Sequence, residues 1–197
     1  MKSLRLTIFA VVISVLTSFS SLALAQSDMQ MSSEAKSANQ SDAQKSFDKL
    51  KTLAGTWQGP ITVDPPRPDV TPGTRGQITM RVTSRGNALV HEMQEAGTPL
   101  DATKYDHPVT MFYVDSDRLT LVHYCDAGNR PRMVGKLSPD GKTVEFDFVD
   151  LSGANTYGHM YHAVFTFIDE NHHIEDWTYM TPGDKPMHAH MDLTKSN

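Results

Sequence analysis

From Trp57 onward, the sequence consists of short segments in which apolar and polar residues alternate. The pattern is clear in residues 77–83 and 143–148, where every second side chain is apolar. A period of two is typical of β-strands with one buried face, because successive side chains of a strand point to opposite sides. The sequence therefore predicts strands at residues 56–63, 76–84, 88–96, 108–115, 118–125, 131–138, 142–150, 158–168, 173–180 and 187–194.

Tight turn signals such as Pro139-Asp140-Gly141 separate these segments and join strands as antiparallel hairpins. A long meander of hairpins exposes two sheet edges, and closing the sheet removes them. We therefore predict an all-β fold, an antiparallel up-and-down barrel of about 8–10 strands, with a β-sandwich as the alternative. Residues 64–73 contain four prolines. Because proline cannot donate to a sheet ladder, we expect a long loop there, at one mouth of the barrel.

A short helix is predicted directly before the first strand. Phe47, Leu50, Leu53 and Ala54 recur at helical spacing, and Gly55 ends the pattern. The preceding residues 26–45 are rich in Ser, Gln, Asp and Ala and have no periodic apolar face. We expect a disordered or partly helical tether there, and the barrel domain over residues 46–197.

The first 25 residues have the three parts of a secretory signal peptide. Lys2 and Arg5 give a positive start, residues 6–16 are mostly apolar, and Ala23-Leu24-Ala25 offers small residues for cleavage. We therefore expect export, cleavage near Ala25, and a mature protein in the periplasm or outside the cell. No later segment has the roughly 18 apolar residues that a transmembrane helix needs.

Charge and cysteine content exclude some classes of protein. The formal net charge is −5, and it becomes more negative once Lys2 and Arg5 are removed with the signal peptide. This argues against nucleic-acid binding, which normally needs a basic surface. Cys125 is the only cysteine, so no internal disulfide can form, and the fold depends on its core alone.

The segment Gly55-Thr56-Trp57-Gln58-Gly59 resembles the Gly-x-Trp opening of the calycins, which include the lipocalin, fatty-acid-binding and nitrobindin-like barrels. In these families the Trp packs across the closed end of the barrel. The resemblance thus implies structural roles for Gly55, Trp57 and Gly59. It also implies an interior cavity that holds an apolar or amphipathic molecule.

A second stretch is similar to uncharacterised exported bacterial proteins. It consists of His123-Tyr124-Cys125 followed by Gly128-Asn129-Arg130-Pro131-Arg132-Met133. Haem binding in the nitrobindin-like group depends on a His near the C-terminal strands. The resemblance therefore makes His188 and His190 candidate haem ligands.

His123 and Cys125 share one face of their predicted strand with two leucines, so both are expected to point into the barrel. A neighbouring His can lower the pKa of a thiol and create a reactive thiolate. The alternative is a buried Cys that acts as a small hydrophobe beside a hydrogen-bonded His. We favour the alternative, because side chains two residues apart in a strand point in parallel.

The neighbouring turn and strand offer two further polar candidates. Asn129 is expected in a tight turn, where it would bond its own backbone. Arg132 would pair with a carboxylate inside the barrel, and we favour an internal salt bridge over a ligand clamp.

Alternation in the later strands places His159 and Tyr161 inward near one mouth, beside an aromatic stripe. Glu175 and Trp177 share a face of the next strand, so an inward Trp177 would bring the carboxylate with it. A buried carboxylate needs a partner, and Arg132 or His159 is expected to provide it.

His188 and His190 share a face of the last strand with Asp192 and could chelate zinc or a similar metal with a third ligand. Against this, the opposite face carries an apolar stripe, which would leave both His side chains in water. The sequence lacks a Gly-x-Ser-x-Gly elbow and a Gly-rich phosphate loop.

These observations predict an exported barrel that binds a small apolar or amphipathic molecule in its interior. The expected ligand-binding residues are His123, Cys125, Arg132, His159, Tyr161, Glu175 and Trp177. One alternative is an isomerase or hydrolase that uses the same cavity with His123 as acid or base. The others are a haem or metal protein and an envelope component without a ligand. No motif specifies a cofactor or an oligomeric state.

Overall fold

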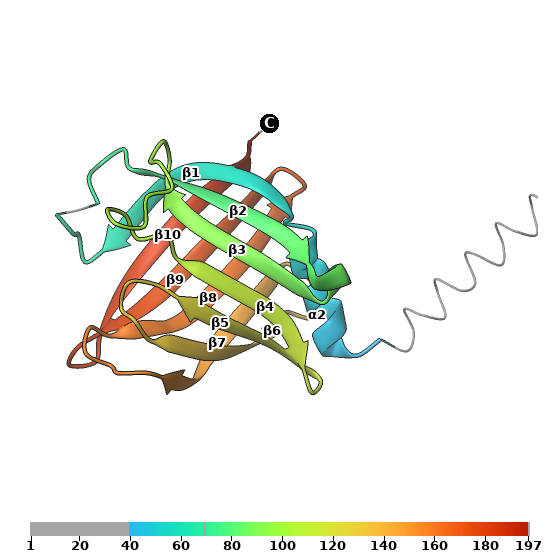
Figure 1. Cartoon of the computed structure of the whole chain (residues 1–197). Coiled ribbons are helices and arrows are strands. Elements are labelled where there is room, and N and C mark those ends of the chain that lie inside the picture. Colours follow the sequence, from blue (N-terminus) through green and yellow to red (C-terminus); the bar gives the residue numbers. More distant parts are fainter. Residues whose placement is uncertain (1–39, 69, 197) are drawn as a thin grey trace, which may run out of the picture. The chain divides into compact units, whose positions relative to one another are not determined.

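The computed structural model describes residues 40–68 and 70–196, which form a closed antiparallel barrel (Figure 1). The predicted signal peptide and most of the predicted tether lie outside these residues. The strands are β1 (Gly55–Asp64), β2 (Arg75–Thr83), β3 (Ala88–Glu95), β4 (Val109–Asp115), β5 (Arg118–Tyr124), β6 (Arg130–Leu137), β7 (Thr143–Ser152), β8 (His159–Asp169), β9 (His172–Thr181) and β10 (Lys185–Lys195). A short 3-10 turn, η1 (Ser84–Gly86), joins β2 to β3.

Each strand pairs with its neighbours in the sequence, and β1 also pairs with β10 to close the barrel. All pairings are antiparallel. This confirms the predicted all-β up-and-down barrel, and the predicted strand ends agree with the observed ones to within two residues. The sheet closes on itself and does not split into the two layers of a sandwich.

The helix α2 (Asp42–Lys51) precedes the barrel and begins earlier than the sequence pattern indicated. Ser41 caps it, because the Ser41 hydroxyl accepts a hydrogen bond from the backbone N–H of Gln44. The last residues of the predicted tether are therefore helical. The helix buries Phe47 and Leu50 against the end of the barrel.

The two ends of the barrel differ, as Figure 1 shows. Short turns connect the strands at the end that α2 covers, which we call the closed end. Longer loops connect them at the opposite end, which we call the open end. These loops are residues 65–74, 96–108, 125–129 and 153–158, the first of which contains the four prolines, and a short turn at 182–184 joins β9 to β10 at the same end. None of the helices in the described ranges is long and apolar enough to span a bilayer.

The closed end is packed around Trp57, which has no exposed surface. Its indole N–H donates to the carbonyl of Leu53 at 2.8 Å, and the ring meets His173 edge-on at 4.3 Å. Gly55 begins β1 with a φ of 145°, a backbone conformation that favours glycine. Gly59 is also required by packing, because a Cβ there would collide with the backbone carbonyl of Asp192 on β10.

Candidate functional site

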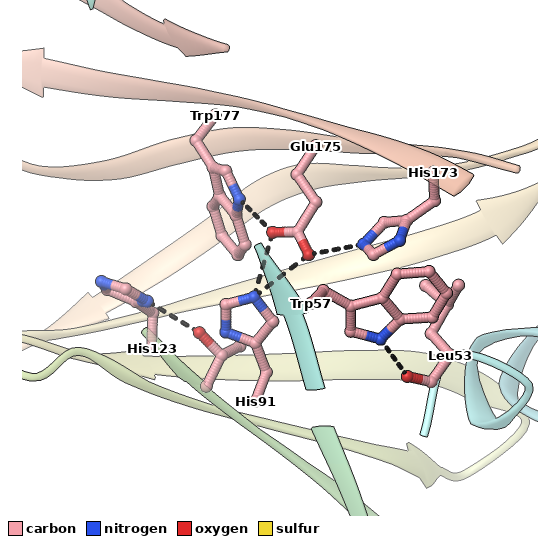
Figure 2. A network of polar contacts seen from close by, with 8 residues as sticks. Leu53, Trp57, His91, His123, His173, Glu175 and Trp177 are labelled. Carbon is pink, nitrogen blue, oxygen red and sulfur yellow. Dashed lines mark hydrogen bonds and ion pairs between the residues drawn. The ribbon is translucent and has the colours of Figure 1, made fainter. Parts of the chain in front are cut away.

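The inward face of β9 carries a polar group in the middle of the apolar core. His173, Glu175 and Trp177 alternate along this face, and all three are buried. The Trp177 indole N–H donates to Glu175 Oε2 at 2.9 Å, and His173 Nε2 lies 3.1 Å from Glu175 Oε1. Figure 2 shows the carboxylate between the two rings.

His91 approaches the same carboxylate from β3. Its Nε2 lies 3.0 Å from Glu175 Oε2 and 3.3 Å from Oε1, and only 1% of the His91 side chain is exposed. We call His91, His173, Glu175 and Trp177 the carboxylate network. β3 and β9 are not neighbours in the sheet, so this contact crosses the barrel interior.

A second buried pair lies beside the carboxylate network. Strand register places His91, Thr110 and His123 in one row across β3, β4 and β5. The Thr110 hydroxyl and His123 Nδ1 are 2.8 Å apart, and the His123 ring lies 5.8 Å from Trp177. Thr110 and His123 thus extend the polar interior from β3 across β4 and β5.

Glu175 is ionised within this network. Burial alone would raise its pKa, but the charge of His91 and the hydrogen bonds from His173 and His91 outweigh burial, so the pKa of Glu175 is lowered. A carboxylate can only accept hydrogen bonds, so both histidines hold a proton on Nε2. The Nδ1 atoms of His91 and His173 are buried without a hydrogen-bond partner. Such atoms are rare in protein interiors and often mark a site for water or a ligand.

His123 is neutral at physiological pH. Burial, followed by the nearby charge of His91, lowers the pKa of His123 from 6.5 to about 3. Its Nδ1 is engaged with Thr110, and no described residue hydrogen-bonds its Nε2. The unbonded nitrogen points away from Glu175, in the direction in which β9 runs from His173 to Trp177 (Figure 2). That direction leads to the open end.

Acid is expected to destabilise the barrel through His123. Unfolded His123 takes up a proton below a pKa of about 6.5, whereas folded His123 stays neutral down to about 3. The unfolded state therefore binds more protons in this window, and the stability falls as the pH falls, by about 1.4 kcal/mol per unit from this group. Urea unfolding at several pH values checks the slope, which His123→Gln should reduce. An unchanged slope between pH 6.5 and 5 would contradict the assignment.

The structure brings together three of the predicted ligand-binding residues. His123, Glu175 and Trp177 all lie in the barrel interior, and His123 and Glu175 each lie next to Trp177. The carboxylate finds its partners in His91 and His173. The predicted partners Arg132 and His159 make no contact with it.

Arg132 lies on the outer face of β6 and forms a two-pronged salt bridge with Asp150 on β7. Arg132 therefore pairs with a carboxylate as predicted, but the prediction that this salt bridge lies inside the barrel is wrong. The cause is the alternation of β6, because the buried Pro131 and Met133 point inward and Arg132 must point outward. A ligand in the interior cannot reach this guanidinium.

His159 and Tyr161 lie at the start of β8 near the open end. His159 is buried, packs against Phe148 with ring centroids 4.7 Å apart, and contacts Asn155 Oδ1 at 3.1 Å. Tyr161, which was predicted to share its inward face, is 42% exposed, and its ring stacks on Phe148 with ring centroids 5.5 Å apart. A register shift between Met160 and His162 breaks the alternation at this point.

Cys125 follows the last residue of β5 and is half-buried at the open end. Burial raises the pKa of its thiol, and the charges of Asp106 and Asp126 raise it further against one backbone hydrogen bond from Ala127. The thiol is therefore protonated at neutral pH. This environment does not favour the thiolate hypothesis for His123 and Cys125.

Asn129 joins two loops of the open end. Its amide donates to the carbonyls of Gly158 at 2.7 Å and Ala154 at 3.2 Å, both in the loop before β8. The prediction that Asn129 bonds its own turn is thus wrong. The loop that holds these two carbonyls lies 25 or more residues from Asn129 in the sequence, and the folded barrel brings it close.

His188 and His190 lie on the outer face of β10, as the apolar stripe of that strand indicated. His188 Nδ1 is 3.1 Å from the Thr178 hydroxyl, and His190 Nδ1 is 2.6 Å from Asp176 Oδ1. Neither side chain faces the barrel interior, so neither can ligate a haem bound there. A different set, Glu145, Asp147 and His162 on the outer face of β7 and β8, has ligand atoms within 4.8 Å of one another and could hold a divalent cation.

His91 and His173 are the residues that the sequence analysis missed. His173 precedes Glu175 by two positions, so the alternation that predicted an inward Glu175 applies to it as well. His91 likewise alternates with Leu89 and Met93. These signals place both imidazoles inside the barrel but do not show that they meet at one carboxylate.

Two surface grooves of about 500 and 530 Å³ lie beside α2 at the closed end. The first is lined by α2 and the β5 and β6 strands, and the second by residues such as Lys49, Phe167 and Lys195. None of the residues of the carboxylate network lines either groove.

Comparison with known proteins shows the fold but no family. No family model and no curated protein matches this chain. Among solved structures, it is similar to the crystal structure of Rv2717c from M. tuberculosis, with 17% sequence identity and a TM-score of 0.55. The match covers 77% of this chain and 98% of that one. At this identity, the likeness concerns the barrel alone.

Proposed function

We propose that this chain is an exported protein that binds a small apolar or amphipathic molecule in the open half of its barrel. The main support is the partial exposure of inward side chains towards the open end, opposite the end that α2 covers (Figure 1). Towards the open end these remain partly exposed, although they continue the buried face of each strand. They are Ile61, Val63, Met93, Phe148, Tyr179, Met187 and Ala189.

The polar atoms at the base of this region can form a hydrogen bond with a polar group of the ligand. Trp177 lies next to His123, whose Nε2 no described residue hydrogen-bonds, and both side chains are 2% exposed. Ligand sites in proteins combine a mostly apolar lining with a few fixed polar groups of this kind. Exposed aromatic side chains also surround the open end, and these are Tyr105, Tyr124, Tyr157 and Tyr161.

The cross-strand neighbours of Trp177 show where a bound molecule can be blocked. Ala163 on β8 and Ala189 on β10 flank it, and Ala189 is only partly buried. A larger side chain at Ala189 would fill the partly exposed position beside Trp177. We expect Ala189→Phe to obstruct the site, whereas His188→Phe, on the outer face of the same strand, should not.

The first test uses N-phenyl-1-naphthylamine, an uncharged aromatic probe that fluoresces in apolar surroundings. The protein should bind it saturably at one site, and Ala189→Phe should weaken binding by about tenfold or more. His188→Phe should bind like the natural chain. Circular dichroism and melting curves establish that both variants fold. Absence of saturable binding, or equal binding by Ala189→Phe, would contradict the proposal.

Mass spectrometry under native conditions provides a second measurement. Protein expressed with its own first 25 residues and purified without detergent is expected to carry a small molecule, whose mass identifies its class. The same sample tests export, because the mature chain should begin at Gln26. A chain that retains Met1 in the cytoplasm would contradict export but not ligand binding.

A further inference from the structure

The charges inside the barrel limit what it can bind. Among the described residues, no Lys or Arg is buried. In this part of the chain, the buried ionisable groups are one carboxylate, Glu175, and four histidines, His91, His123, His159 and His173. Of these, His123 is neutral, and burial lowers the pKa of His159 as well.

The one buried carboxylate is already saturated with donors. Glu175 accepts from His91, His173 and Trp177, so it has little capacity left for a ligand cation. The charge of His91 is paired with the Glu175 carboxylate at 3.0 Å, so the interior offers no unpaired positive charge to an anion and no free negative charge to a cation. Because an unpaired charge in an apolar interior is costly, both kinds of ligand are disfavoured.

Carboxylates at the open end also disfavour the binding of anions, because they repel a negatively charged ligand. The backbone N–H of Asp126 donates to Asp106 Oδ1 at 3.1 Å, which brings the two side chains close together. Although Asp106 reaches solvent, desolvation and the Asp126 charge raise its pKa. Of the cations at this end, Arg67 is exposed, contacts Met187 Sδ at 3.7 Å and already has interaction partners, and Lys104 is exposed with its Nζ 3.5 Å from Asp101 Oδ2.

We infer that the ligand of the open half is electrically neutral, an aromatic or otherwise apolar molecule with one uncharged polar group. That group would hydrogen-bond His123 Nε2, which a neutral imidazole can use as donor or acceptor depending on its tautomer. Fatty acids and other carboxylate or sulfonate amphiphiles would be excluded. This inference rests on the proposed function, since it specifies the ligand of the same site.

A matched pair of probes tests the inference. N-phenyl-1-naphthylamine is uncharged, and 8-anilino-1-naphthalenesulfonate is the same skeleton with a sulfonate. We count only the signal that Ala189→Phe removes, so that binding elsewhere on the surface does not contribute. The neutral probe should bind at least about tenfold more tightly than the sulfonate. Comparable or tighter binding of the sulfonate would overturn the inference and leave the proposed function standing, whereas failure of both probes would overturn the proposed function.

A charge variant tests the cause of the selectivity. Met93 faces inward near the open end of β3, and its neighbour Gln94 faces outward. Met93→Lys adds a cation to the interior and should strengthen sulfonate binding by about tenfold, while Gln94→Lys adds the same charge outside and should not. Equal sulfonate binding by the two folded variants would overturn the electrostatic explanation.

Discussion

Replacing Glu175 by alanine is expected to cost about 3–5 kcal/mol of unfolding free energy. The change leaves three buried donors, on His91, His173 and Trp177, without their acceptor. Such a loss is a large share of the roughly 5–15 kcal/mol that stabilises a typical domain. Urea unfolding at pH 7, followed by far-UV circular dichroism, measures it directly.

Two further variants serve as a milder substitution at Glu175 and as a surface control. Glu175→Gln keeps the volume but offers one acceptor in place of two, so it should lose less than the alanine variant and remain measurable if that variant does not fold. Asp176→Asn, the next residue on the outer face, removes an exposed partner of His190 and should cost less than about 1 kcal/mol. If Glu175→Ala lost no more stability than Asp176→Asn, the carboxylate network would not support the barrel.

The second large effect is expected at Gly59, where alanine should destabilise the barrel by more than about 3 kcal/mol. The added Cβ would collide with the backbone carbonyl of Asp192, which no rotamer change can relieve. Because β1 and β10 form the closing seam, separating them at this position weakens the whole sheet. Denaturant unfolding of the purified variant gives the size of the loss.

Gly183→Ala is the control for this substitution. Gly183 has a φ of +83°, so alanine is strained there, but a Cβ would meet no atom within 4 Å. We expect a loss of about 1 kcal/mol from the backbone alone. Equal losses at Gly59 and Gly183 would show that close strand packing is not the reason for glycine in β1.

The strands could be predicted from the sequence because the barrel imposes a simple rule on each of them. One face meets the core and the other meets water, so apolar residues such as Ile78 and Met80 recur at every second position. This local rule also identified the inward faces that carry His123, Glu175 and Trp177. The early start of α2 could have been predicted as well, since Ser41 and Gln44 have the spacing of an N-terminal cap.

The contacts within the site could not be predicted, because they depend on strands that are distant in the sequence. His91 and Glu175 are 84 residues apart and meet only when the sheet closes. Bulges are a second obstacle, since a register shift interrupts the alternation of β8 at Tyr161, which is 42% exposed although alternation assigned it to the core. The inward face of a strand can thus be predicted from the residues of that strand. The contacts across the barrel depend on how the closed sheet brings distant strands together.

Binding beside Trp177 is the central claim, and the two indole N–H signals in a proton–nitrogen NMR spectrum test it most directly. The chain contains only Trp57, at the closed end, and Trp177, beside His123. Trp57→Phe assigns the signals by removing one. Saturation with N-phenyl-1-naphthylamine should shift the Trp177 signal and leave the Trp57 signal in place. A spectrum in which neither signal moves, or only that of Trp57 moves, would contradict a ligand site in the open half of the barrel.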